Sequence, residues 1–465
     1  MVIRVTTPYF EEKGEECGIV AIYSKKGKDV APLLYRALIA LQHRGQDAAG
    51  FAVYDGGNIE ARHGIGLVAD IFKPDDLELK GRVGIGHTRY PTIGECRLCD
   101  VQPSVFTNIA VAHNGHVANY DILKKELEED GYKFTSSVDS EPFAFLIHRR
   151  KDIDTAVKEI MTRVEGAFSD VAIVDDKLVV FRDPHAIRPL VWGENDEFIC
   201  FTSETVALDI NGIPYRGDVK GGELVLIGRT EVRKQIVPEN ARHCMFEYVY
   251  FSRPDSKING KSVHEVRKLL GSILAAEAPA KADVVIPIPD TSRNAAASYA
   301  KALGVPCEEG LIKNRYIGRT FIMPSQEKRT DAVRLKLNAV REIINQKSVV
   351  LVDDSIVRGT TLKEIVALVK SAGAKEVHLR ITCPPVKAPC FYGVDMSTYS
   401  ELIANKKTVE EIRQFLGADS LAYVSLDGLH KAVGLPICTG CLTGEYHSEF
   451  VTKLAENAKG RNACG

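Results

Sequence analysis

Two adjacent carboxylates, Asp353 and Asp354, end the apolar run VVLV and precede a short loop that leads into a predicted helix. The loop and the helix start carry a guanidinium, a glycine and two hydroxyls: Arg358, Gly359, Thr360 and Thr361. Backbone N–H groups at a helix start bind phosphate, and paired acids suit the vicinal hydroxyls of a ribose or a magnesium ion. The sequence therefore indicates a sugar-phosphate site. The alternative is a strand end whose acids only cap the next helix.

Four short motifs in the first third of the chain also carry chemically competent side chains: CGIV from Cys17, HTRY at 87–90, HNG at 113–115 and VDSE at 138–141. Each has an ordinary structural explanation. A cysteine at the start of a strand is usually a small buried hydrophobe. HNG is common in turns, and an aspartate before a helix is commonly its N-cap. Only their combination, in this order, indicates a catalytic site.

The chain has eleven cysteines, an odd number scattered over 465 residues. Because no export signal is present, we expect reduced thiols, and clustered thiols indicate a metal or catalytic site before a disulfide. Cys438 and Cys441 form CTGC, a spacing at which two thiolates can chelate one metal centre. Cys96 and Cys99 lie in ECRLC, where we favour two loop cysteines over a local disulfide or a metal clip.

Composition limits the classes of function. The length suggests about three average domains or two large ones. With 60 Lys and Arg against 62 Asp and Glu, the net charge is −2, and a general footprint for nucleic acid is absent. No apolar run nears the roughly 18–20 residues of a membrane span. Residues 1–16 lack the apolar core of a secretory signal. We therefore expect a cytoplasmic protein that binds neither nucleic acid nor a membrane.

Predicted strands and helices come in groups over the first 245 residues. Apolar runs predict strands at 17–24, 50–54, 83–87, 109–113, 171–181, 197–202 and 222–227. Apolar residues at helical spacing predict helices at 30–41, 119–129, 140–150 and 153–164. Grouped strands favour an α+β domain in which helices cover sheet layers.

After about residue 245, predicted strands and helices alternate. ADVVIPIP, SVVLVDD and EVHLRITC predict buried strands, and NAAASYAKALG predicts a helix. A further helix, with an apolar face from Leu362 to Val369, ends at Gly373. Units of strand, loop, helix and strand build parallel sheets. This part is therefore predicted to be a doubly wound α/β domain with its chemistry at the carboxyl ends of the strands.

The string VVLVDDSIVRGTT resembles the signature of type I phosphoribosyltransferases, which bind phosphoribosyl pyrophosphate (PRPP) with magnesium. PIPDTSRNAA and LIKNRYIGRTFI closely match one member of the same group. The resemblance implies that PRPP binds Asp353, Asp354, Arg358, Gly359, Thr360, Thr361, Lys313 and Arg315. It also implies one Mg²⁺ per subunit near Thr291, Asp353 and Asp354. Residues 313–336 hold seven Lys and Arg against two acids, a net of +5, and we expect this loop to close over the ligand.

The four motifs from Cys17 onward resemble class II glutamine amidotransferases, whose N-terminal cysteine hydrolyses glutamine. Residues 1–16 would then be a propeptide, and its removal gives Cys17 a free α-amino group with a pKa of about 7.7–8, suited to a general base. The thiolate attacks the amide carbonyl, and Asn114 and Gly115 bind the oxyanion. Arg89 binds the α-carboxylate of glutamine, and Asp139 binds its α-amino group.

Together the two halves resemble the glutamine PRPP amidotransferases, from Cys17 to about Phe450. The implied fold is an α+β N-terminal nucleophile (Ntn) glutaminase domain, a four-layer αββα sandwich, at 17–245. An α/β type I phosphoribosyltransferase domain with a parallel sheet and a C-terminal cluster-binding segment follows at 246–450, and 451–465 form a tail. The implied reaction passes ammonia from glutamine to PRPP and yields 5-phosphoribosylamine, glutamate and pyrophosphate, the first committed step of purine synthesis. The family further implies purine nucleotide feedback and a homotetramer.

Two other classes of protein would share the motifs of only one of the two predicted domains. A relative of glutamate or asparagine synthetases would share the first domain, and VVLVDDSIVRGTT argues against it. A PRPP-binding regulator of transcription would share the second domain. The charge of −2 and the motifs from Cys17 onward argue against that class.

The flanks of two further cysteines, ARHCMFEYVYF and PPVKAPCFYGVD, resemble the branch of the family that carries a 4Fe–4S cluster. Four cysteines match its ligands in order: Cys244, Cys390, Cys438 and Cys441. The resemblance implies one cluster per subunit, with a structural role, because neither half-reaction moves electrons. Zinc suits four thiolates equally, and two unrelated buried pairs are the remaining alternative.

Overall fold

The computed structural model describes residues 17–90, 97–150, 152–314, 337–396 and 398–461. The predicted propeptide, Cys96, Arg315 and the rest of the basic segment up to residue 336 lie outside the described residues. Within the described part of the chain, no helix is long and apolar enough to cross a bilayer.

The first part of the chain forms two antiparallel sheets. One has the order β11-β9-β10-β1-β4-β2-β3, and the other has the order β13-β12-β8-β7-β6-β5. The first contains β1 (Gly18–Ser24), β2 (Ala48–Tyr54), β3 (Ile59–Ile65), β4 (Val83–Arg89), β9 (Val191–Glu194), β10 (Phe198–Thr202) and β11 (Tyr215–Asp218). The second contains β5 (Ser104–Phe106), β6 (Ile109–Val117), β7 (Gly166–Val174), β8 (Lys177–Arg182), β12 (Glu223–Ile227) and β13 (Glu231–Gln235).

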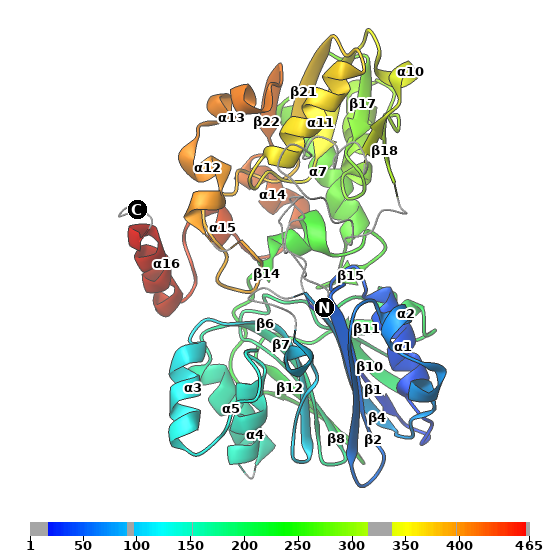
Figure 1. Ribbon diagram of the computed structural model, residues 1–465, viewed down its shortest axis with the longest axis vertical. Helices are drawn as coiled ribbons and strands as arrows, with labels where there is room; N and C mark the ends of the chain where they lie inside the picture. The colour runs from blue at the N-terminus through cyan, green and yellow to red at the C-terminus, as the bar shows by residue number, and fades with distance from the viewer. Residues whose placement is uncertain (1–16, 91–96, 151, 315–336, 397, 462–465) are drawn as a thin grey trace, which may run out of the picture.

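Helices cover the outer face of each sheet (Figure 1). The first sheet is covered by α1 (Ala31–Ala40), α2 (Val68–Ile71) and α6 (Val206–Asp209), and the second by α3 (Tyr120–Glu129), α4 (Glu141–Arg149) and α5 (Ile153–Arg163). Ile19 and Ala21 of β1 pack between the sheets, whereas Val20 and Ile22 pack under α1. Burial on both faces explains why β1 is a continuous apolar run. The four-layer αββα sandwich is confirmed.

The predicted single strand at 171–181 is wrong, because this run forms the hairpin of β7 and β8. Val174 pairs with Lys177, and Asp175 has a φ of 53° in the turn between them. Aspartate tolerates this left-handed conformation, which is a turn signal inside an apolar run. Strands β3, β5, β11 and β13, which the sequence did not predict, are the edges of the two sheets. Edge strands are half-solvated, so their sequences lack a continuous apolar run.

The second part is a doubly wound α/β domain, as predicted. Its parallel sheet has the order β17 (Val284–Pro287), β20 (Ser348–Asp353), β21 (Glu376–Ile381) and β22 (Ser420–Tyr423). One face packs on α7 (Val263–Glu277), α8 (Arg293–Leu303) and α14 (Leu426–Val433), and the other on α11 (Thr360–Ser371) and α13 (Val409–Leu416).

Shorter elements complete this part. They are β14 (His243–Cys244), β15 (Lys257–Ile258), β16 (Lys261–Ser262), β18 (Leu311–Lys313), β19 (Leu337–Ala339), β23 (Ile437–Cys438), α10 (Arg341–Ile344), α12 (Ile403–Lys406) and α15 (Gly440–Thr443). The segment predicted to be a tail contains most of α16 (Glu449–Arg461), which buries Val451 and Ala455.

A buried ion network joins the two parts beside Cys17. Arg44 donates to Glu204 through Nη1 at 2.7 Å and to Glu247 through Nη2 at 2.7 Å. Its Nε donates to the carbonyl oxygen of Cys17 at 3.1 Å. Arg188 lies 3.9 Å from Glu247, which begins a π-helical turn (Glu247–Phe251) at the junction. Residues that are far apart in the sequence are thereby held around the start of β1.

We expect Glu247→Gln to lower the free energy of unfolding by about 3 kcal/mol, because removing one partner of a buried ion pair leaves Arg44 undercompensated. The matched control is Glu197→Gln, which removes an exposed pair with Lys28 at 2.6 Å and costs less than about 1 kcal/mol. The midpoint of denaturant unfolding measures both. Equal shifts for the two variants would contradict a stabilising role for the network.

Candidate functional site

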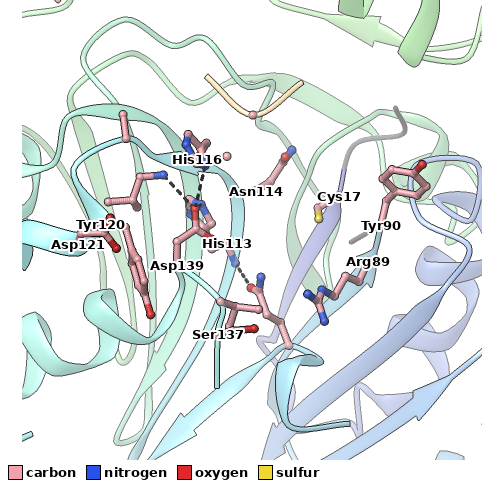
Figure 2. A pocket seen from close by; sticks show the side chains of 16 residues that line it. Cys17, Arg89, Tyr90, His113, Asn114, His116, Tyr120, Asp121, Ser137 and Asp139 are labelled. Atoms are coloured by element: carbon pink, nitrogen blue, oxygen red, sulfur yellow. Dashed lines mark hydrogen bonds and ion pairs between the residues drawn. The ribbon is translucent and has the colours of Figure 1, made fainter. Parts of the chain in front are cut away.

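A cavity of about 270 Å³ opens at the ends of the central strands of the glutaminase-like part, and Figure 2 shows its lining. Five residues predicted from separate motifs line it: Cys17, Arg89, Asn114, Gly115 and Asp139. The register of β1 and β4 pairs Gly18 with Thr88, which brings the neighbouring Cys17 and Arg89 to the same edge of the sheet. The structure therefore unites the four motifs in one site.

Asn114 and Gly115 lie on β6, across the cavity from β1. The Asn114 side chain is 2 % exposed, and its Nδ2 has no hydrogen-bond partner in the described part of the chain. Buried donors are nearly always paired, so this amide is suited to a ligand oxygen. At Gly115 a Cβ would lie 1.9 Å from the carbonyl oxygen of Ala167, so only glycine permits the pairing of β6 with β7 here.

Asp139 is held as an anion. It accepts a hydrogen bond from the Val117 N–H at 2.9 Å, and its Oδ2 lies 3.5 Å from His116 and 3.9 Å from His113. Burial alone would raise the pKa of Asp139, but His113, His116 and the Val117 amide together hold that pKa well below its usual range. The carboxylate is ionised at neutral pH and can bind a cationic group.

His113 has a second carboxylate behind it, which the sequence analysis did not identify. Its Nδ1 lies 3.0 Å from Oδ1 of Asp170 on β7. Burial raises the pKa of Asp170 to about 6. Burial also acts to lower the pKa of His113, but Asp170 and Asp139 outweigh it and raise that pKa above its ordinary value. His113 thus lies between two carboxylates: Asp139 lines the cavity, and Asp170 lies behind the imidazole.

The predicted sugar-phosphate site lies at the carboxyl end of β20. Thr291 donates to Asp354, and Ser292 donates to Asp353 at 3.3 Å. The parallel pairing of β17 with β20 brings these segments together. Gly359, with a φ of 79°, directly precedes α11, which begins with Thr360 and Thr361. The carboxylates, Thr291 and the helix start are therefore neighbours, as predicted.

Two predicted basic contacts have other partners in this structure. The guanidinium of Arg358 pairs with Glu401 at 2.6 Å. Lys313 lies 3.5 Å from Asp290. Both pairs are exposed and contribute little to stability, so a phosphate-bearing ligand can displace them.

The four cysteines predicted as cluster ligands converge at the junction between the two parts. Cys244 of β14 is paired in register with Cys438 of β23. Burial raises the pKa of Cys441 well above its usual value, and the thiols of Cys390, Cys438, Cys383 and Cys244 add to the rise. Cys383 is a fifth thiol that the sequence analysis did not include.

A buried set of thiols is the donor chemistry that a thiolate-bound metal centre needs. The Sγ of Cys390 also accepts the Tyr392 N–H at 3.3 Å. Over the described ranges, however, no three His, Cys, Asp or Glu side chains are already arranged to hold a metal ion. The four cysteines therefore have the side chains and the common location that a thiolate-bound metal centre needs. Their thiols are not already arranged around one metal position.

Comparisons with known proteins match both halves of the chain. A family model described as "Glutamine amidotransferase domain" matches residues 97–209, and one described as "Phosphoribosyl transferase domain" matches residues 257–413. An amidophosphoribosyltransferase of Methanothermobacter thermautotrophicus is 47% identical over 460 residues, covering 96% of this chain and 97% of the relative. One from Bacillus subtilis is 43% identical over 454 residues, covering 94% and 95%.

Solved structures agree with the sequence relatives. The glutamine PRPP amidotransferase from B. subtilis complexed with ADP and GMP has a TM-score of 0.88 and 42% identity, covering 93% of this chain and 98% of its own. A structure described as the allosteric regulatory enzyme of purine biosynthesis has a TM-score of 0.89 and 42% identity, covering 93% of this chain and 97% of its own. The similarity extends over nearly the whole length of the chain.

Proposed function

The chain belongs to the amidophosphoribosyltransferase family, and from this premise we propose how its residues divide the reaction. The enzyme takes the amide nitrogen of glutamine and transfers it to PRPP, which gives 5-phosphoribosylamine, glutamate and pyrophosphate. The observation that carries the assignment is the cavity in which Cys17 meets the other motif residues. The match over both halves excludes the two classes that share only one domain.

Glutamine hydrolysis uses Cys17 as nucleophile. After removal of residues 1–16, its α-amino group accepts the thiol proton, and the sulfur attacks the amide carbonyl. The developing oxyanion receives hydrogen bonds from the Asn114 side chain and the Gly115 N–H, which fits an Asn114 Nδ2 that has no partner among the described residues. Ammonia leaves with the returned proton, and water hydrolyses the thioester to glutamate. The hydrogen bond from Arg44 to the Cys17 carbonyl fixes the backbone of the nucleophile.

Glutamine is oriented by its two charged groups. Arg89 binds the α-carboxylate, since a guanidinium matches a carboxylate with two parallel hydrogen bonds. Asp139 binds the α-ammonium, which is supported by its depressed pKa. The amide end of the substrate then reaches Cys17 on the other side of the cavity.

PRPP binds at the end of β20. Asp353 and Asp354 hold the ribose hydroxyls and, with Thr291, one Mg²⁺ per subunit. The segment Arg358–Thr361 binds the 5-phosphate. Oxygen donors of this kind suit magnesium, which when bound neutralises charge on the pyrophosphate. Ammonia attacks the anomeric carbon and pyrophosphate departs. Lys313 and Arg315 add positive charge beside it, and Arg358 leaves Glu401 when the ligand is bound.

Cys244, Cys390, Cys438 and Cys441 would hold one 4Fe–4S cluster per subunit. Because neither half-reaction transfers electrons, such a cluster would be structural and would join the glutaminase domain at 17–245 to the end of the phosphoribosyltransferase domain at 246–450. Residues 451–461 belong to α16, and Ser448, just before this helix, donates to Glu165 of the first domain at 2.5 Å.

Purine nucleotides regulate the enzyme by feedback, and the chain assembles as a homotetramer in the cytoplasm. The solved B. subtilis relative, described as complexed with ADP and GMP, supports the first part of this proposal. Family resemblance alone supports the tetramer.

Two reciprocal variants test the division into half-reactions. We expect Cys17→Ala to lower glutamine-dependent synthesis more than about a thousandfold while ammonia-dependent synthesis persists, because the nucleophile serves only one domain. The double variant Asp353→Asn, Asp354→Asn should abolish synthesis from either nitrogen source and keep basal glutaminase activity. Loss of ammonia-dependent synthesis in Cys17→Ala, or unchanged PRPP binding in the double variant, would refute the assignment.

Metal analysis tests the cluster. Protein purified without oxygen should be brown and contain about four irons and four sulfides per chain. Cys390→Ser should lose iron and mature poorly, whereas Cys307→Ser, which changes an exposed cysteine of the same domain, should match the wild type. One zinc per chain in colourless protein would identify the rival metal, and active enzyme without metal would rule out both.

A further inference from the structure

One wall of the glutamine cavity belongs to the other domain. Gly393 lines the cavity together with Cys17 and Gly115, although it follows β21 of the phosphoribosyltransferase domain. The pale orange segment beside Asn114 in Figure 2 is this part of the chain. The glutaminase site is therefore completed by a segment more than two hundred residues away in the sequence.

Gly393 packs directly on the backbone of Gly115. A Cβ at Gly393 would lie 3.0 Å from the carbonyl oxygen of Gly115, 3.1 Å from its carbonyl carbon and 2.9 Å from Nη2 of Arg188. Its φ of 108° also disfavours any side chain. On its other side, Gly115 faces the Ala167 carbonyl, which a Cβ would approach to 1.9 Å. The backbone of Gly115 thus lies between Ala167 and Gly393, and these two close approaches require glycine at positions 115 and 393.

The segment that carries Gly393 is itself anchored to buried groups. The Tyr392 carbonyl accepts hydrogen bonds from Nε of Arg188 at 2.9 Å and from its Nη2. Arg188 is 1 % exposed and faces Glu247. Glu247 in turn accepts a hydrogen bond from Arg44, and Arg44 donates to the Cys17 carbonyl. One connected set of contacts therefore reaches both the nucleophile and the peptide of Gly115.

We propose that Gly393 is a positioning residue of the glutaminase reaction: its contact with the Gly115 carbonyl fixes the backbone of Gly115 and thereby orients the N–H that binds the oxyanion. The inference rests on the oxyanion role given to Gly115 above. It adds that this role depends on a residue of the synthase domain. A methyl group at 393 must displace the Gly115 peptide or Arg188 by a few tenths of an ångström, and catalytic geometry is sensitive to shifts on this scale.

The test compares Gly393→Ala with Gly304→Ala in the full-length enzyme. Gly304 caps α8 in the same domain with a φ of 71° and has no atom within 4 Å of a Cβ, so it imposes backbone strain without a clash. We expect Gly393→Ala to lower kcat of glutamine hydrolysis about tenfold. The KM for glutamine and ammonia-dependent synthesis should stay at wild-type values, because Arg89, Asp139 and the PRPP site are not moved. Gly304→Ala should leave all three unchanged.

A Gly393→Ala enzyme with wild-type kcat for hydrolysis would overturn the proposal, as would equal losses of hydrolysis and ammonia-dependent synthesis. If this variant does not fold, Arg188→Lys supplies the second test, because lysine keeps the charge beside Glu247 but cannot donate both hydrogen bonds to Tyr392. Its kcat for hydrolysis should also fall with KM retained, and a wild-type kcat would overturn the proposal. A wild-type enzyme that fails to hydrolyse glutamine would refute the proposed function itself and this inference with it.

Discussion

The arrangement of the site depends on the buried contact between Arg44 and two glutamates. Arg44, Glu204 and Glu247 are almost wholly inaccessible to solvent, and unpaired charges at such depth cost several kcal/mol each. The network can therefore form only when the end of α1, the end of β10 and the domain junction meet correctly. Nε of Arg44 also donates to the Cys17 carbonyl, so the nucleophile is placed by the same residue that joins the domains.

Close contact between the two domains suits the chemistry of ammonia. Free ammonia at neutral pH is mostly ammonium, which is not nucleophilic, so an internal transfer that excludes water avoids that loss. The two domains are in contact at the glutamine cavity: Gly393 lines the cavity, and Arg188 of the first domain donates a hydrogen bond to the Tyr392 carbonyl. The converging thiols of Cys390 and Cys441 lie in the same junction. The residues that surround the glutamine cavity and the residues that hold the second domain against the first thus lie in the same part of the molecule.

The sequence predicted most of the inner strands, though not β9, and it predicted the motif residues, for physical reasons that also explain much of what it missed. Strand β1 is buried on both faces and is therefore a continuous apolar run, whereas the edge strand β13, EVRKQ, is exposed over almost its whole length and carries no such signal. Arg89, Asn114 and Asp139 were found because each belongs to a short local motif. The ion pair of Arg358 with Glu401 and the approach of Gly393 to Gly115 depend on tertiary packing, and no local pattern encodes them.

An isotope experiment tests the union of two half-reactions in one chain most directly. Wild-type enzyme is given glutamine labelled with ¹⁵N at the amide, PRPP with magnesium, and a large excess of unlabelled ammonium, and the ¹⁵N content of the phosphoribosylamine is measured. If ammonia passes between the domains without equilibrating with solvent, the product carries the glutamine label despite the excess. Product whose nitrogen has the isotopic composition of the bulk ammonium would contradict the account.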